Sequence, residues 1–148
     1  MRCTNNQRGY FGIGIEHVKS SHNIGTLWRT AHIFGAAFIF TIGRRYQKQP
    51  SDTMCSSRHV PLYHYTTLDD MYEHRPYNCQ LIGIELDSRA VPLETFNHPQ
   101  RVIYLLGAED NGLTEVARHR CHAIVQLPSD YCLNVAVAGS IVMYHRLM

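Results

Sequence analysis

The sequence predicts an α/β domain built around a largely parallel sheet. Short apolar runs of strand length alternate along the chain with amphipathic stretches of helical length. The chain has 148 residues, enough for one compact domain with a hydrophobic core and short for two. Hydrophobic residues make up 45% and charged residues 18% of it, as is typical of a folded protein. We therefore expect residues 1–148 to form one domain with one site.

The N-terminal part predicts a strand, a helix and a second strand. The strands are expected over residues 10–16 and 36–42. Apolar side chains recur at helical spacing over residues 24–34, with Asn23 as the expected N-cap and Gly35 as the end. Residues 43–65 are polar and aperiodic, which predicts a long loop that either contacts the substrate or has no role.

The C-terminal part continues the alternation. The expected order is a helix over residues 67–75, strands over 79–86 and 101–106, a helix over 113–120, a strand over 122–127, and a helix from 133 to about 148. The last helix is apolar on most faces, so we expect it to be covered on more than one side.

Composition and charge exclude several classes of protein. The formal net charge is only +2, so no polycationic tail indicates nucleic acid. No apolar run has the length of a membrane span, and the start of the chain has no hydrophobic signal core. The five cysteines are widely spaced and include no CxxC pair, which predicts reduced thiols. A cytoplasmic protein is the expectation.

Generic cofactor and metal motifs are incomplete. Gly12 and Gly14 resemble the start of a dinucleotide fingerprint, but His17 takes the place of the third glycine. No GxxxxGK[ST] phosphate loop is present. Cys55, with His59 and His64 nearby, lacks the second ligand pair of a tetrahedral zinc site. We therefore expect no metal.

The first unusual segment is the start of the expected first helix. Gly25 and Arg29 are four residues apart and so share one face of that helix. An RNA backbone could approach closely over Gly25 while Arg29 points at it. The alternative is an amphipathic helix with one solvated arginine.

The second segment follows the expected strand 101–106. Gly107 and Gly112 flank the acidic Glu109, which indicates a tight turn at the carboxyl end of a strand. Ligands of open α/β sheets bind at that edge. An ordinary glycine turn that precedes a helix is equally compatible with these residues.

The third segment precedes the last helix. A strand ends near Pro128, and Asn134 places an amide where the apolar helix begins. Asn134 is suited to cap that helix. Cys132 has no recognisable partner base, so we interpret it as a small neutral pocket residue.

Together the three segments resemble a known family. They read N-x-G-x-x-x-R-x-A, G-x-E-x-x-G-L and P-x-x-x-x-L-N-V-x-V-A, in the order and spacing of the SpoU/TrmH branch of the SPOUT methyltransferases. The resemblance extends from Ile13 to Met148, and the chain looks like a minimal member without an added RNA-binding domain. Cys132 and Ala136 stand where the family usually has serine.

The resemblance implies methyl transfer from S-adenosylmethionine to a ribose 2′-hydroxyl of RNA. It also implies a C-terminal trefoil knot, and a homodimer in which Arg29 of one subunit lies near the cofactor of the other. The implied cofactor-binding residues lie in three loops: Leu86, Gly107, Leu127, Cys132 and Leu133.

The implied catalytic residues are Arg29, Asn134, Glu109 and Asn23. Because guanidinium stays protonated, we prefer Arg29 as a phosphate clamp rather than a base. Asn134 and Glu109 would then orient the ribose or complete the pocket, and Asn23 would support Arg29.

Two alternatives remain at this point. The chain could be a non-catalytic RNA-binding module that kept the fold, or an enzyme that methylates a base. Retention of all four residues favours catalysis on ribose. Analogy with small relatives favours tRNA over ribosomal RNA as the substrate.

Overall fold

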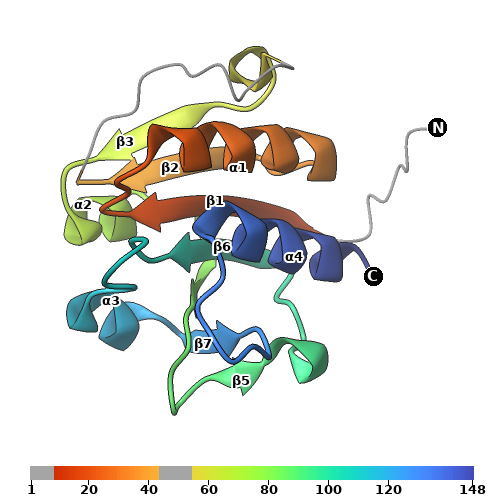
Figure 1. Cartoon of the computed structure of the whole chain (residues 1–148). Helices are drawn as coiled ribbons and strands as arrows, with labels where there is room; N and C mark the ends of the chain where they lie inside the picture. Colours follow the sequence, from red (N-terminus) through yellow and green to blue (C-terminus); the bar gives the residue numbers. More distant parts are fainter. Residues whose placement is uncertain (1–8, 44–54) are drawn as a thin grey trace.

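Parallel strands dominate the computed structural model, which describes residues 9–43 and 55–148 (Figure 1). In these residues seven strands form one sheet in the order β3-β2-β1-β6-β4-β7-β5, and every pairing is parallel. The strands are β1 (Tyr10–Glu16), β2 (Phe38–Ile42), β3 (Leu62–Tyr65), β4 (Gln80–Ile84), β5 (Val91–Pro92), β6 (Arg101–Leu106) and β7 (Ala123–Gln126). The carboxyl ends of all the strands therefore lie along one edge of the sheet.

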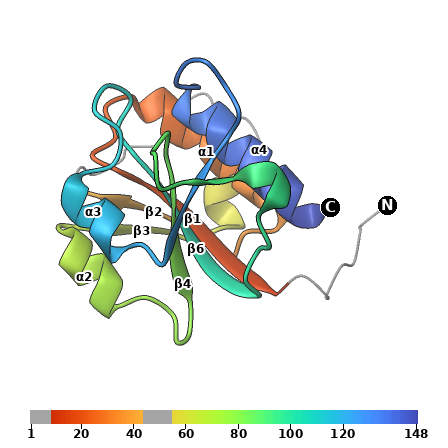
Figure 2. The same ribbon diagram turned by 90° about the horizontal axis from the view of Figure 1, so that it is seen from below.

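Helices cover both faces of the sheet (Figure 2). Helices α1 (Ser21–Phe34) and α4 (Val135–Leu147) pack on one face, and α2 (Leu68–Glu73) and α3 (Glu115–Arg120) pack on the other. Each pair of helices encloses a hydrophobic core against its face of the sheet. In strand β6, Tyr104 points into the core under α1 and α4, and Ile103 and Leu105 point into the core under α2 and α3, so both faces are apolar. Among the described residues, no helix is long and apolar enough to cross a membrane.

The last helix of the chain lies beside the first one. Gly139 makes this approach possible, because a Cβ there would lie 2.6 Å from Leu27 Cδ1 and 3.0 Å from Leu106 Cδ1. The described residues leave the opposite side of α4 largely exposed, with Val137 47%, Ile141 38% and Tyr144 55% exposed. The expectation that α4 is covered on more than one side is therefore not met in the described part of the chain.

Several boundaries agree with the sequence. Strands β1 and β6 have the expected bounds, and Gly35 ends α1 in the left-handed conformation, with φ of 76°. Helix α1 begins at Ser21 rather than at residue 24, so Asn23 lies inside the helix and does not cap it. Its side chain instead bonds to a partner far away in the sequence, as described below.

The expected loop over residues 43–65 is only partly a loop. Its described end contains the 3₁₀ turn η1 (Ser56–Arg58) and strand β3, and residues 44–54 lie outside the described residues. Strand β3 is an edge strand whose side chains are all at least partly exposed, so it lacks the run of buried apolar residues that predicted the central strands. The two-residue strand β5 and the turn η2 (Leu93–Thr95) were also not expected.

Candidate functional site

A cavity of about 240 Å³ lies beyond the carboxyl ends of β4, β6 and β7. The loops that follow these strands line it, together with the start of α4. In an open parallel sheet, this edge is where ligands bind. The lining residues are Ile84, Glu85, Leu86, Leu106, Gly107, Ala108, Glu109, Asp110, Asn111, Gly112, Leu127, Ser129, Cys132, Leu133, Val135 and Ala138.

All five residues that the resemblance implies for the cofactor lie in this lining. Leu86 follows β4, Gly107 follows β6, and Leu127, Cys132 and Leu133 follow β7. These loops are separated by at least 20 residues in the sequence, and the parallel register brings them together. Their roles toward a ligand remain a prediction.

Gly107 and Gly112 close a narrow turn on the wall of the cavity. Ala108 and Gly112 exchange two backbone hydrogen bonds, with N···O distances of 3.2 and 3.0 Å. A Cβ at position 107 would lie 2.1 Å from the carbonyl carbon of Gly112, so a side chain there would collide with backbone. The turn therefore requires glycine at position 107 and lets backbone face the cavity.

The three sequence segments meet in one chain of hydrogen bonds. Glu109 Oε1 accepts from Asn23 Nδ2 at 2.9 Å and from the Ser20 N–H at 3.1 Å, and Oε2 accepts from the Lys19 N–H at 3.0 Å. Asn134 Nδ2 in turn donates to Asn23 Oδ1 at 3.0 Å. Glu109 thus accepts from the two backbone N–H groups that directly precede α1 and from a side chain in its first turn.

Asn134 also caps α4, as the sequence predicted. Its Oδ1 accepts from the backbone N–H groups of Ala136 at 2.9 Å and Val137 at 3.3 Å. The amide therefore uses its oxygen for α4 and its nitrogen for Asn23 on α1. This double role fixes the starts of the two helices relative to each other.

Arg29 lies apart from this chain of contacts. It is exposed on α1, six residues beyond Asn23 and so about 9 Å further along the helix axis. Within the described part of the chain it makes no hydrogen bond or ion pair. Gly25 is buried, which contradicts the expected close approach of a backbone over that position.

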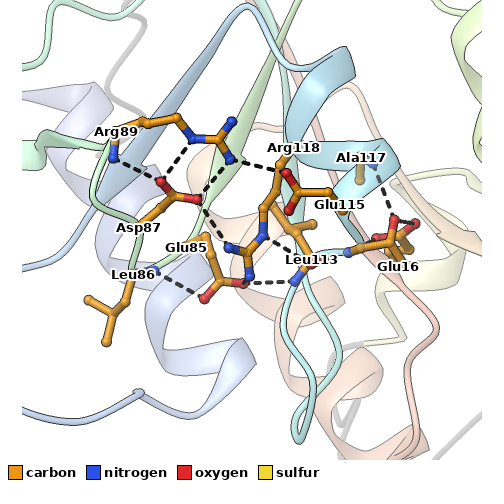
Figure 3. A network of polar contacts seen from close by, with 10 residues as sticks. Glu16, Glu85, Leu86, Asp87, Arg89, Leu113, Glu115, Ala117 and Arg118 are labelled. Atoms are coloured by element: carbon orange, nitrogen blue, oxygen red, sulfur yellow. Dashed lines mark hydrogen bonds and ion pairs between the residues drawn. The ribbon is translucent and has the colours of Figure 1, made fainter.

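A set of acidic residues that the sequence did not single out holds the loops (Figure 3). Glu16 is 3% exposed, and its carboxylate accepts from the Thr114 N–H at 3.0 Å and from Thr114 Oγ1 at 2.8 Å. Glu85 accepts from the Leu113 N–H at 2.7 Å. Glu16 is the last residue of β1, and Glu85 directly follows β4; both strands are mostly buried and apolar. That position was the available signal, since a carboxylate there must find donors in the neighbouring loops.

Electrostatics in this region favour charged carboxylates. Partial burial raises the pKa of Glu109, but hydrogen bonds from Asn23 and from the Lys19 and Ser20 amides outweigh it and leave that pKa below its usual value. The hydrogen bond from Lys19 lowers the pKa of Asp110. Hydrogen bonds from Arg89, and one from Arg118, hold the pKa of Asp87 far below its usual range. Glu109, Asp110 and Asp87 are therefore ionised at neutral pH and engaged in these contacts.

Comparison with known proteins places the chain in a family. Residues 11–144 match the SpoU rRNA Methylase family. The chain is 27% identical over 141 residues to the 23S rRNA (guanosine-2′-O-)-methyltransferase RlmB of Acinetobacter baylyi, covering 89% of this chain and 57% of that protein. It spans 57% to 63% of the length of the curated relatives that it matches.

Solved structures agree with this match. An AdoMet-bound rRNA methyltransferase from Sinorhizobium meliloti has a TM-score of 0.82 and 25% identity, covering 95% of this chain and 56% of that one. A chain from a study of the 2-OH methylation of C/U34 on tRNA has a TM-score of 0.80, with 95% of both chains covered, and its 20% identity shows a shared fold alone. The chain belongs to the SpoU rRNA methylase family.

Proposed function

We propose that this chain transfers a methyl group from S-adenosylmethionine to a ribose 2′-hydroxyl of RNA. The main support is that the loops after β4, β6 and β7 converge on one cavity at the carboxyl edge of the sheet. Hydrogen bonds from Asn23 to Glu109 and from Asn134 to Asn23 tie two of these loops to the start of α1. The similar Acinetobacter protein is named for 2′-O methylation, and the similar Sinorhizobium structure is named as bound to AdoMet.

The cavity has the chemistry for the adenosine part of this cofactor. The side chains of Leu86, Leu106, Leu127, Leu133 and Ala138 supply apolar walls suited to a flat base. The backbone of the turn at residues 107–112 supplies hydrogen-bonding groups. The volume of about 240 Å³ is slightly below the ~300 to 1,000 Å³ of typical small-molecule sites. We expect the base and ribose to be enclosed and the methyl-bearing end to face the RNA.

Arg29 has the properties of an anion clamp in this proposal. When bound, the cofactor supplies an activated methyl group on a sulfonium, and the ribose oxygen must be held in line with it. The guanidinium of Arg29 is exposed, stays protonated and can bind a phosphate in a bidentate manner. We therefore infer that it holds the RNA phosphate and stabilises negative charge that develops on the attacking oxygen.

The acids that line the cavity are poorly placed to act as a general base. Glu109 accepts three N–H groups, Glu85 accepts two, and Asp110 is paired with the Lys19 ammonium. These contacts lower the pKa of Glu109 and of Asp110, which makes both weaker proton acceptors, and Glu85 is already engaged with two amides. We infer that the 2′-hydroxyl loses its proton late, to solvent. Asn23, Glu109 and Asn134 then serve to fix the segment that carries Arg29.

We further propose a homodimer that completes the site. Helices α1 and α4 expose a neighbouring apolar set, which consists of Ile33, Val137, Ile141 and Tyr144. A second copy of the chain would cover this set. The family resemblance implies that Arg29 of one subunit lies near the cofactor of the other, and the separation of Arg29 from Asn23 within one chain supports this proposal.

The trefoil knot is also part of the proposal. It is supported by the family resemblance and by the meeting of the loops after β4, β6 and β7 at one cavity. Such a knot would hold the loop at residues 127–133 against the turn at 107–112 without a disulfide.

The activity can be tested directly with purified protein. We expect the protein to incorporate methyl groups from S-adenosylmethionine into RNA, and the methyl to resist alkaline cleavage at the adjacent phosphate because it blocks the 2′-oxygen. Total tRNA and ribosomal RNA should be compared, with tRNA as the expected substrate. Binding to RNA without methyl transfer would support the RNA-binding module, and a methylated base in the digest would support base methylation.

Arg29→Ala should abolish methyl transfer while leaving the fold and cofactor affinity nearly unchanged. Loss of an electrostatic clamp costs on the order of a hundredfold to a thousandfold in rate. Arg29→Lys should rescue little, because an ammonium cannot reproduce bidentate contact. Single-turnover kinetics on RNA, a thermal melt and a cofactor titration measure the three properties. Arg120→Ala, on the far face, is the matched control, and near-normal turnover in Arg29→Ala would refute the clamp.

Glu109→Gln should weaken the response of stability to acid. Because the folded-state pKa of Glu109 lies below the usual 4.5, its carboxylate stabilises the fold above that pH and loses this effect as the pH falls through the folded value. The deficit of the variant in unfolding free energy should therefore be largest at neutral pH and shrink on acidification. Urea titrations over a pH series measure it. The exposed Glu94→Gln is the control, and a constant deficit at all pH values would contradict the expectation.

The dimer should dissociate when charge is placed on the apolar set. Ile141→Asp would bury a carboxylate at the interface, and an unpaired buried charge is costly. We expect light scattering to give a dimer mass for the wild type and a monomer mass for the variant, with circular dichroism unchanged. Val116→Asp, which alters an exposed apolar residue of α3, is the control. A monomeric wild type at micromolar concentration would refute the dimer.

A further inference from the structure

We propose that Arg118 is a positioning residue for the cofactor cavity, because it fixes the two loops that follow β4 and β6 in one arrangement. This inference rests on the proposed cofactor site. Arg118 lies on α3 and is not among the residues that line the cavity. It would act through its neighbours, without touching the ligand.

The guanidinium of Arg118 bonds to both loops at once (Figure 3). Its Nε donates to the Leu113 carbonyl oxygen at 3.1 Å, in the loop after β6. Its Nη1 donates to Asp87 Oδ2 at 3.0 Å, in the loop after β4. Its Nη2 lies 3.9 Å from Glu85 Oε2, at the end of β4. Three nitrogens of Arg118 therefore contact three different groups, which are the Leu113 carbonyl and the carboxylates of Asp87 and Glu85.

Glu85 links Arg118 to the wall of the cavity. Its Oε1 accepts from the Leu86 N–H at 3.0 Å, and its Oε2 accepts from the Leu113 N–H at 2.7 Å. The glycine turn packs directly on this carboxylate, since a Cβ at Gly112 would lie 2.2 Å from Oε2. Glu85, Leu86 and Gly112 all line the cavity. The position of the Glu85 carboxylate thus sets the positions of Leu86 and of the turn at Gly112, which both form part of the cavity wall.

The charges explain why Arg118 is required. The side chains of Glu85 and Asp87 are only 11% and 5% exposed, so these two acids need a cation. Arg89 binds Asp87 from the outer side, with its Nε 3.1 Å from Oδ1. Among the described residues, Arg118 alone pairs with both acids. Without it, Glu85 would be free to turn toward water and release the Leu86 and Leu113 amides.

The same helix offers a matched control. Arg120 lies two residues further along α3, pairs with Asp69 and stacks over the Tyr72 ring, 4.8 Å from its centroid. Both of these partners belong to α2 on the far side from the cavity. Arg120→Met therefore removes a paired arginine from α3 without touching either loop.

The test measures affinity for S-adenosylhomocysteine by calorimetry. Arg118→Met should raise Kd roughly tenfold, the lower end of what losing a supporting residue behind a site costs. Arg118→Lys should fall between Arg118→Met and wild type, because an ammonium cannot reach all three partners. Arg120→Met should bind as wild type does. In methyl transfer, KM for the cofactor should rise more than kcat falls.

A second readout requires no ligand. Amide hydrogen exchange at Leu86 and Leu113 should be faster in Arg118→Met than in wild type and in Arg120→Met, because these amides donate to Glu85. Asp87→Asn combined with Arg118→Met should weaken binding less than the sum of the single changes, because the two residues act as a pair.

The outcomes separate the two proposals. A wild type that binds no S-adenosylhomocysteine would overturn the cofactor site itself. A wild type that binds, together with a folded Arg118→Met that has wild-type Kd and exchange, would overturn the positioning role alone. Equal losses in Arg118→Met and Arg120→Met would overturn it too. If Arg118→Met does not fold, wild-type Kd in both Arg118→Lys and Asp87→Asn overturns it.

Discussion

The parallel pairing of β1 with β6 is the constraint on which the site depends. Its register runs from Tyr10 opposite Arg101 to Ile15 opposite Leu106, so both strands end at the same height. The loop into α1 and the glycine turn therefore begin side by side, and Glu109 reaches Asn23 across 86 residues of sequence. Strand β4 pairs with the other side of β6, and β7 pairs with β4. The loops that follow β4 and β7 therefore reach the same edge of the sheet.

Carboxylates at this edge of the sheet hold the neighbouring loops through hydrogen bonds. Glu16, Glu85 and Glu109 each accept hydrogen bonds from backbone N–H groups of a neighbouring loop or helix start. Hydrogen bonds to a carboxylate are stronger than hydrogen bonds to a neutral acceptor. They hold loops that lack the backbone hydrogen bonds of a sheet. The same bonds use some of the acceptor sites that a general base would need. The proposed reaction would therefore depend on positioning more than on acid–base chemistry.

The sequence predicted those features that depend on local pattern. Short apolar runs predicted the bounds of β1 and β6, and the Asn134 cap and the Gly107 turn follow from residue type and position. What it did not reveal depends on partners distant in the chain. By residue type and position, Asn23 is suited to be an N-cap, but its side chain bonds to the distant Glu109. Arg118 resembles a solvated helix residue in the sequence, but it bonds to the distant Asp87. Edge strand β3 has no buried face to produce a pattern.

Arg29 and Arg118 illustrate how the surroundings of one residue type decide its role. Both lie on helices near the carboxyl edge of the sheet. Arg118 is 24% exposed with two acids and a carbonyl as partners, so its donors are committed and it can only hold structure. Arg29 is exposed, with no ion pair among the described residues, so all five of its N–H groups are available for a phosphate. An arginine that is kept clear of acids retains its full attraction for an anion, which is what the proposed phosphate clamp requires.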